Sequence, residues 1–192
     1  MPTRNIRKPS GQGSQDEIKK VQLLPNTKTE RYRSTFILDD KVYGMRLEHG
    51  KTGDGGPMIM LLVEPITGGV PDASPEVFAH GRLFPSKEPL PELRQIFGDV
   101  KTAELMRYNQ PPGSKETVPE LKKGRGVGTA VLRELEKIAF EQDIDVLYAI
   151  TDEKNVPARK SLEKSGYTLH PKPYNVDEWV DMLYYKKLQS KG

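Results

Sequence analysis

The stretch Lys123-Gly124-Arg125-Gly126-Val127-Gly128-Thr129 decides how the second half of the chain is interpreted. Its glycines let the backbone approach a ligand closely, and apolar residues at helical spacing follow directly. The first turn of a helix has N–H groups without intrahelical partners and carries partial positive charge. Lys123 and Arg125 add cations, and Thr129 adds a hydroxyl donor. A turn of this kind at the start of a helix predicts a binding site for a diphosphate.

Two other phosphate-binding motifs are excluded by their spacing. A P-loop needs a lysine directly after its last glycine, where this chain has Thr129. A dinucleotide fingerprint needs a third glycine at a position that falls on Thr129 or Val131. Taken alone, the glycine cluster is equally compatible with a flexible, solvated loop that leads into a helix.

The segments on either side of the turn predict a strand, a helix and a second strand. Lys101–Tyr108 is a strand candidate, and a helix is expected from about Gly126 to Glu141. The apolar residues that recur at helical spacing are Val127, Val131, Leu135 and Ile138 or Ala139. Asp145–Thr151 contains a continuous apolar run, which is typical of a central strand covered on both faces.

A second helix is predicted from Val156 to Lys164. Asn155 is a good N-cap for it, and Gly166 can adopt the left-handed conformation that ends helices. Tyr167–Leu169 and Met182–Leu188 supply closing strands. The second half of the chain is therefore expected to form an α/β layer with a crossover connection.

Short apolar runs separated by turn residues predict an antiparallel meander in the first half. The strand candidates are Val21–Leu24, Ser34–Leu38, Val42–Leu47, Met58–Val63 and Val77–Phe84. Asp39-Asp40 and Gly53–Pro57 are the turn-rich spacers, and Leu90–Phe97 is a short helix candidate. Residues 1–17 are polar and lack apolar periodicity, so we expect a flexible tail followed by a single domain over residues 18–192.

Composition limits the classes of function. The net charge of +3 is too small to imply a nucleic-acid partner by itself. No run of 18 apolar residues occurs, and the first twenty residues lack a secretory apolar stretch, so we expect a soluble, cytoplasmic protein. The chain has no cysteine, which excludes thiolate metal sites and a cysteine-linked acyl intermediate. The three histidines have no ligand-like spacing, and we assign no metal.

The glycine-rich turn resembles the Gln/Arg-x-x-Gly-x-Gly/Ala signature of the Gcn5-related N-acetyltransferase (GNAT) superfamily, with Lys123 at its first position. A second family element is similar to the stretch that starts at Asn155-Val156-Pro157-Ala158 and ends at Gly166-Tyr167. The resemblance covers residues 100–188 well. The link from Tyr108 to Lys123 is longer than the family usually shows, and we interpret it as a substrate loop or as a small shift of the alignment.

The resemblance implies a GNAT-like α/β fold, in which a mostly antiparallel, splayed mixed sheet is flanked by helices. Acetyl-CoA or another acyl-CoA would lie between the splayed strands, here Lys101–Tyr108 and Asp145–Thr151. The residues implied in its binding are Leu105, Met106, Arg107, Lys123, Gly124, Arg125, Gly126, Val127, Gly128, Thr129 and Asn155.

Acyl transfer needs a base for the attacking amine and a proton donor for the departing thiolate. Ala103-Glu104-Leu105-Met106 resembles the strand that carries a glutamate base in some members, so Glu104 is the candidate base; otherwise it is a solvent-facing strand carboxylate. Many members have a tyrosine as the acid where this chain has Leu162. The substitutes considered are Ser161, Tyr148, Tyr167, Tyr174 or water.

The sequence therefore predicts direct transfer of an acetyl group from acetyl-CoA to a primary amine on a small molecule or protein. Two alternatives stay open: an inactive acyl-CoA-binding GNAT-like module, and a basic protein that binds nucleic acid or another partner. The acceptor, the acyl-chain length and the oligomeric state, including a homodimer, are not specified by the sequence.

Overall fold

The computed structural model describes residues 22–23, 31–67, 70–71, 79–108, 126–176 and 179–189. The helices are α1 (Pro91–Phe97), α2 (Val127–Glu141) and α3 (Val156–Lys164). The strands are β1 (Gln22–Leu23), β2 (Ser34–Leu38), β3 (Lys41–Lys51), β4 (Pro57–Thr67), β5 (Val70–Pro71), β6 (Ala79–Ser86), β7 (Thr102–Tyr108), β8 (Val146–Asp152), β9 (Thr168–Leu169), β10 (Tyr174–Val176) and β11 (Trp179–Lys187). The predicted tail over residues 1–17 lies outside the described residues.

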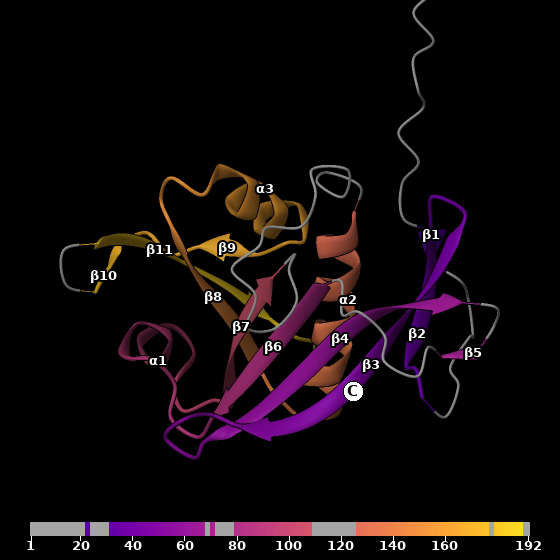
Figure 1. Ribbon diagram of the computed structural model, residues 1–192. Coiled ribbons are helices and arrows are strands. Elements are labelled where there is room, and N and C mark those ends of the chain that lie inside the picture. Colours follow the sequence, from indigo (N-terminus) through magenta and orange to yellow (C-terminus); the bar gives the residue numbers. More distant parts are fainter. Residues whose placement is uncertain are drawn as a thin grey trace, which may run out of the picture.

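The strands form one mixed sheet in the order β1-β2-β3-β4-β6-β7-β8-β11-β10, with β5 beside β4 and β9 beside β11 (Figure 1). Among the described strands, β7 and β8 pair in parallel and every other pair is antiparallel. The crossover between β7 and β8 carries α2. The predicted α/β fold with a mostly antiparallel mixed sheet and flanking helices is confirmed.

The meander begins with a tight turn and continues in a long hairpin. Asp39 and Asp40 both have positive φ, 53° and 59°, which suits a two-residue connection between β2 and β3. The hairpin of β3 and β4 pairs from Val42 opposite Ile66 to Lys51 opposite Pro57. Both strands are longer than predicted, because their polar ends are held by pairing.

A buried carboxylate ties the first strands together. The Glu64 side chain is 0% exposed. It accepts hydrogen bonds from Arg46 Nε at 2.8 Å, from Arg31 Nη2 at 3.3 Å and from the Tyr32 hydroxyl at 3.2 Å. The Tyr32 ring lies against Gly44, where a Cβ would come within 2.5 Å of it. Because these partners compensate the charge, Glu64 can be buried in the sheet.

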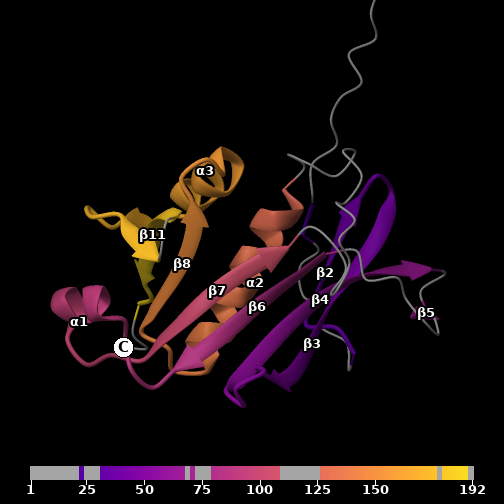
Figure 2. The ribbon, with the colours of Figure 1, turned by 60° about the vertical axis from the view of Figure 1, so that its left-hand side comes forward.

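The main core lies between the sheet and α2. The predicted apolar face of α2 is buried, with Val131, Leu135 and Ile138 between 0% and 2% exposed. At Gly81 of β6 the helix approaches closely: a Cβ there would lie 2.5 Å from Leu135 Cδ1. Figure 2 shows α2 running along β6 and β7. This packing fixes the position of the N-terminus of α2 relative to β7.

The opposite face of the second half carries a smaller cluster beneath α1. Leu93 of α1 packs with Val146 and Tyr148 of β8 and with Leu183 of β11. The intervening β8 residues, Leu147 and Ala149, belong to the main core. The strand is therefore covered on both faces, as its continuous apolar run predicted.

The ends of α3 agree with their local signals. Asn155 Oδ1 accepts a hydrogen bond from the Ala158 N–H at 3.3 Å, and Gly166 has a φ of 82°. The predicted bounds of this helix are confirmed. The strands β5 and β10 were not predicted. No helix among the described residues is long and apolar enough to cross a membrane.

Candidate active site

The parallel pairing of β7 with β8 is short. It runs from Thr102 opposite Val146 to Glu104 opposite Tyr148 and then ends, although β7 continues to Tyr108 and β8 to Asp152. Figure 2 shows the two strands diverging toward their carboxyl ends. Strand edges that face one another without pairing leave backbone polar groups for another partner. The sheet therefore offers an extended ligand two unpaired strand edges beyond Glu104.

The segment Leu105–Arg107 of β7 lies on this divergent part. Its other edge pairs with β6, where Leu105 is opposite Leu83 and Arg107 is opposite Gly81. Leu105 is 3% exposed and faces the core beneath α2, whereas the Met106 side chain is half-buried on the other face. The contribution of this segment to a site is accordingly its main chain.

The first turn of α2 lies at the same end of the sheet, because a crossover helix runs antiparallel to the strands that it connects (Figure 2). Gly126 is the N-cap in a left-handed conformation, with φ 97° and ψ 0°, and no side chain caps this end. The Ala130 N–H bonds to the Gly126 carbonyl at 2.9 Å. The N–H groups of residues 127–129 precede that first intrahelical bond and are available to an anion.

The side chains of this turn are compatible with an anion. Val127 is buried in the core, while Gly128 and Thr129 are half-buried, and the first turn contains no acidic residue. A glycine at position 128 keeps the approach to the helix end open. Lys123, Gly124 and Arg125 lie outside the described residues.

Glu104 stands where the pairing of β7 and β8 ends. Its side chain is half-buried, and burial raises the pKa of its carboxyl above the ordinary value. Within the described ranges we find no hydrogen bond or ion pair from this carboxylate. An unpaired carboxylate with a raised pKa is well suited to accept a proton.

Tyr148 is the cross-strand neighbour of Glu104 and lies on the same face of the sheet. It is 6% exposed, and its pKa is raised far above the ordinary value by burial, by the Glu104 charge and by Tyr174. Burial also raises the pKa of Tyr174, to which Glu92 and Glu104 contribute. Both phenols therefore stay protonated at neutral pH and can donate hydrogen bonds.

The other candidates for the proton donor belong to the main core or to α3. Leu162, which the resemblance aligns with a tyrosine of the family, is 3% exposed in the main core. Tyr167 belongs to the same core, with the Lys186 ammonium 5.5 Å from its ring centroid. Ser161 lies on α3, and its carbonyl accepts the Ser165 hydroxyl at 2.9 Å. Only Tyr148 and Tyr174, among the predicted substitutes, are electrostatically coupled to Glu104 in the described part of the chain.

Asn155 has a structural role as the N-cap of α3. Its side chain caps α3 through the Ala158 N–H. A role toward the cofactor stays a prediction.

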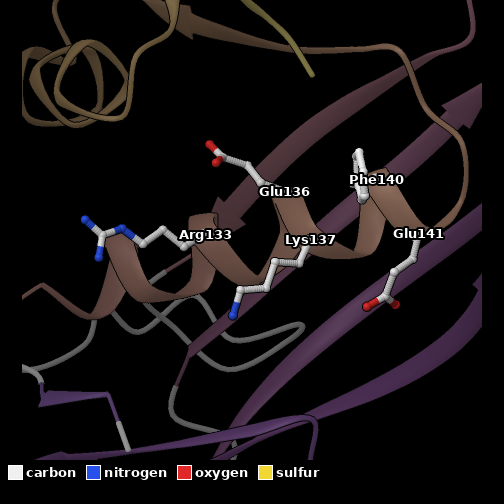
Figure 3. A pocket seen from close by; sticks show the side chains of 5 residues that line it. All are labelled: Arg133, Glu136, Lys137, Phe140 and Glu141. Atoms are coloured by element: carbon white, nitrogen blue, oxygen red, sulfur yellow. The ribbon is translucent and has the colours of Figure 1, made fainter. Parts of the chain in front are cut away.

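A surface hollow lies elsewhere, on the outer side of α2 (Figure 3). Its lining residues are Arg133, Glu136, Lys137, Phe140 and Glu141. Two of them anchor the helix: Glu141 pairs with Arg33 at 2.7 Å, and Glu136 pairs with Lys186 at 2.8 Å. The hollow contains none of the predicted site residues. No group of metal-ligating side chains occurs in the portion of the chain that the structure describes.

Comparisons with known proteins agree with the motifs and the fold. Residues 118–167 match the acetyltransferase (GNAT) family model. The structure resembles that of NAA60 from Arabidopsis thaliana in complex with acetyl-CoA, with a TM-score of 0.51 and 13% identity over 70% of this chain and 78% of that chain. No curated protein matches the chain by sequence.

Two further structures are less similar. A protein from Acinetobacter baylyi ADP1 gives a TM-score of 0.46 and 14% identity over 70% of this chain and 65% of that chain. The GNAT domain of S. lividans PAT gives 0.44 and 18% over 68% of this chain and 61% of that chain. The chain thus spans less than two thirds of these two relatives. The chain is thus similar to GNAT acetyltransferases in residues 118–167 and in its splayed mixed sheet.

Proposed function

We propose that the protein is an acyl-CoA-dependent N-acyltransferase that transfers an acetyl group from acetyl-CoA to a primary amine. The observation that carries this proposal is the end of the β7–β8 pairing at Glu104, at the same end of the sheet as the open first turn of α2. Acetyl-CoA is present in the similar NAA60 structure.

The cofactor fits the residues present. The diphosphate would bind at the N–H groups of Val127, Gly128 and Thr129, with Lys123 and Arg125 as cations. The pantetheine amides would bind the main chain of Leu105, Met106 and Arg107, where β7 has left β8. The absence of an acidic side chain from the first turn of α2 supports this assignment.

The proposed reaction is direct transfer, since the chain has no cysteine to carry the acyl group. The neutral amine nitrogen attacks the thioester carbonyl carbon, and its proton passes to the Glu104 carboxylate. The C–S bond then breaks, and the thiolate takes a proton from water or from a phenol. The raised pKa of Glu104 makes it a better proton acceptor than an exposed carboxylate. Tyr148, the cross-strand neighbour of Glu104, would donate a hydrogen bond to the developing oxyanion.

A second candidate is an acyl-CoA-binding module without turnover. It is favoured by one observation: Leu162 is buried in the core where many members of the family have the catalytic tyrosine. This module would bind acetyl-CoA as the enzyme does but release no thiol with any amine.

The test begins with thermal unfolding in the presence of acetyl-CoA. At about a hundred times its dissociation constant the cofactor adds roughly 2.7 kcal/mol of stability, which raises Tm by about 5 to 10 °C. Gly128→Glu should abolish the rise, because it places a negative charge at the first turn of α2. The matched control is Gly53→Glu, on the exposed β3–β4 loop, where a Cβ meets nothing within 4 Å.

Thiol release with a panel of primary amines then separates the enzyme from the binding module. A Tm that does not respond to acetyl-CoA in the folded wild type would refute the cofactor site. In that case a steep salt dependence of binding to nucleic acid would favour the basic-protein alternative.

A further inference from the structure

Two carboxylates and two phenols converge on the face of the sheet that α1 covers. Glu104 and Tyr148 are cross-strand neighbours on this face. Tyr174 of β10 packs against the small cluster that contains Tyr148 and Leu93 of α1. Glu92 precedes Leu93, and its charge acts on Tyr174. We call Glu92, Glu104, Tyr148 and Tyr174 the carboxylate–tyrosine cluster.

Within the described residues, three polar side chains of this cluster lack hydrogen-bond partners. Glu92 Oε2 is buried and has no hydrogen-bond partner. Tyr148 is 94% buried, since 6% of it is exposed, yet its hydroxyl makes no hydrogen bond within the described ranges. Glu104 is likewise without a hydrogen bond or an ion pair there. Buried polar groups normally have partners, so Glu92 Oε2 and the Tyr148 hydroxyl are available to a ligand.

Among the described residues, no lysine or arginine pairs with the carboxylates of this cluster. The charges that act on Tyr148 and Tyr174 come from Glu92, Glu104 and the phenols themselves, and no lysine or arginine is among them. The contrast with Glu64 is direct, because that buried carboxylate binds Arg31 and Arg46. Two carboxylates whose charges both act on Tyr174, with no cation among the described residues that act on it, favour a positively charged ligand.

We propose that the carboxylate–tyrosine cluster selects acceptors that carry a second positive charge, and that Glu92 is the residue that recognises this charge. The inference rests on the proposed function and names its substrate class: an aliphatic diamine. One amino group lies at Glu104 as the neutral amine, and its proton passes to the Glu104 carboxylate as the nitrogen attacks the thioester. The other remains an ammonium ion and pairs with Glu92. The hydroxyl oxygens of Tyr148 and Tyr174 accept N–H hydrogen bonds from either group.

The experiment compares 1,4-diaminobutane with butylamine, which has the same carbon chain and one charge fewer. Thiol release with acetyl-CoA gives kcat/KM for each amine. We expect the wild type to prefer the diamine by about tenfold or more, which corresponds to about 1.4 kcal/mol. Glu92→Gln should bring this ratio close to one and change kcat/KM for butylamine little. Glu88→Gln is the matched control: Glu88 is exposed, and its main chain alone bonds to Ser86.

Two results would overturn the inference: equal kcat/KM for the two amines in the wild type, or a diamine preference that survives Glu92→Gln. The first needs no variant, so it holds even if Glu92→Gln fails to fold. If no amine releases thiol, the proposed function has failed. Calorimetric binding of the two amines to the CoA-saturated protein then tests the inference independently of turnover. Tighter binding of 1,4-diaminobutane than of butylamine, lost in Glu92→Gln, would support it; equal binding would refute it.

Discussion

Replacing Gly81 with alanine should push α2 away from the sheet. A Cβ at this position would lie 2.5 Å from Leu135 Cδ1 and 2.8 Å from Val131 Cγ1. Carbon atoms in contact are about 3.5 to 4.0 Å apart, so the overlap is about 1 Å. Overpacking of this kind costs about 1 to 3 kcal/mol. In a chain of this size, Tm should fall by about 2 to 12 °C.

A double-mutant cycle with Leu135 tests whether the stability lost in Gly81→Ala comes from the contact with that side chain. Leu135 is fully buried, and Leu135→Ala should cost about 2 to 5 kcal/mol by itself. The same change removes Cδ1, the atom that a methyl group at Gly81 would meet. The double variant should therefore lose at least about 1 kcal/mol less than the sum of the two single losses. Urea denaturation of the four proteins gives the coupling free energy.

Additivity of the two losses within about 0.5 kcal/mol would refute the reasoning, because the methyl group at Gly81 would then not act through Leu135. Gly53→Ala is the control, since a Cβ there meets nothing within 4 Å. It should leave the free energy of unfolding almost unchanged. A gain of about 0.4 to 1 kcal/mol in this control would measure the general effect of removing a glycine from the unfolded chain, and the loss at Gly81 would be corrected by that amount.

Three further changes have defined outcomes. Glu104→Gln should raise Tm, and the difference from the wild type should widen as pH rises: a carboxyl with a raised folded-state pKa contributes stability below its unfolded pKa and loses it as pH rises through the folded pKa. A Tm difference between the variant and the wild type that stays constant from about pH 4 to pH 8 would contradict a raised pKa of Glu104 as its cause. Tyr184→Phe should cost about 1 to 2 kcal/mol in urea denaturation, because the buried hydroxyl donates to Glu163 Oε1 at 3.0 Å and accepts from Arg159 Nε at 3.2 Å. Asn155→Ala should cost about 1 kcal/mol by removing the cap of α3, whereas Asn155→Asp should retain most of it; equal losses in the two variants would speak against capping.

Helix ends could be predicted from the sequence because their signals are local. Asn155 and Gly166 limit α3, and Gly126 precedes α2, within a residue of the predicted positions. Strand ends could not, because pairing across the sheet determines them. The polar part of β3, including Glu48, is held in the sheet by its position opposite Met60 of β4. The short strand β10 exists through its pairing with β11 and has no periodicity of its own.

The candidate site could be predicted only where its signals are local in the sequence. Glu104 was identified from the residues around it in β7, by resemblance. Glu92 was not, because nothing in its local sequence indicates that α1 packs beside Tyr148 and Tyr174. An acidic residue in the first turn of a helix is usual, and this is the ordinary interpretation of Glu92. Only the register of the sheet and the packing of Leu93 bring these side chains together.

The short pairing of β7 with β8 also has a consequence for the order of folding. Three residue pairs join these strands, against seven between β6 and β7 and seven between β8 and β11. The meander on one side is built from neighbours in sequence, whose loops close quickly, whereas the parallel pair must wait for the α2 connection. The two halves of the sheet should therefore form as separate cooperative units, with this junction completed last. The same weak junction would open first in the folded protein, so native-state hydrogen exchange should be fastest there among the central strands.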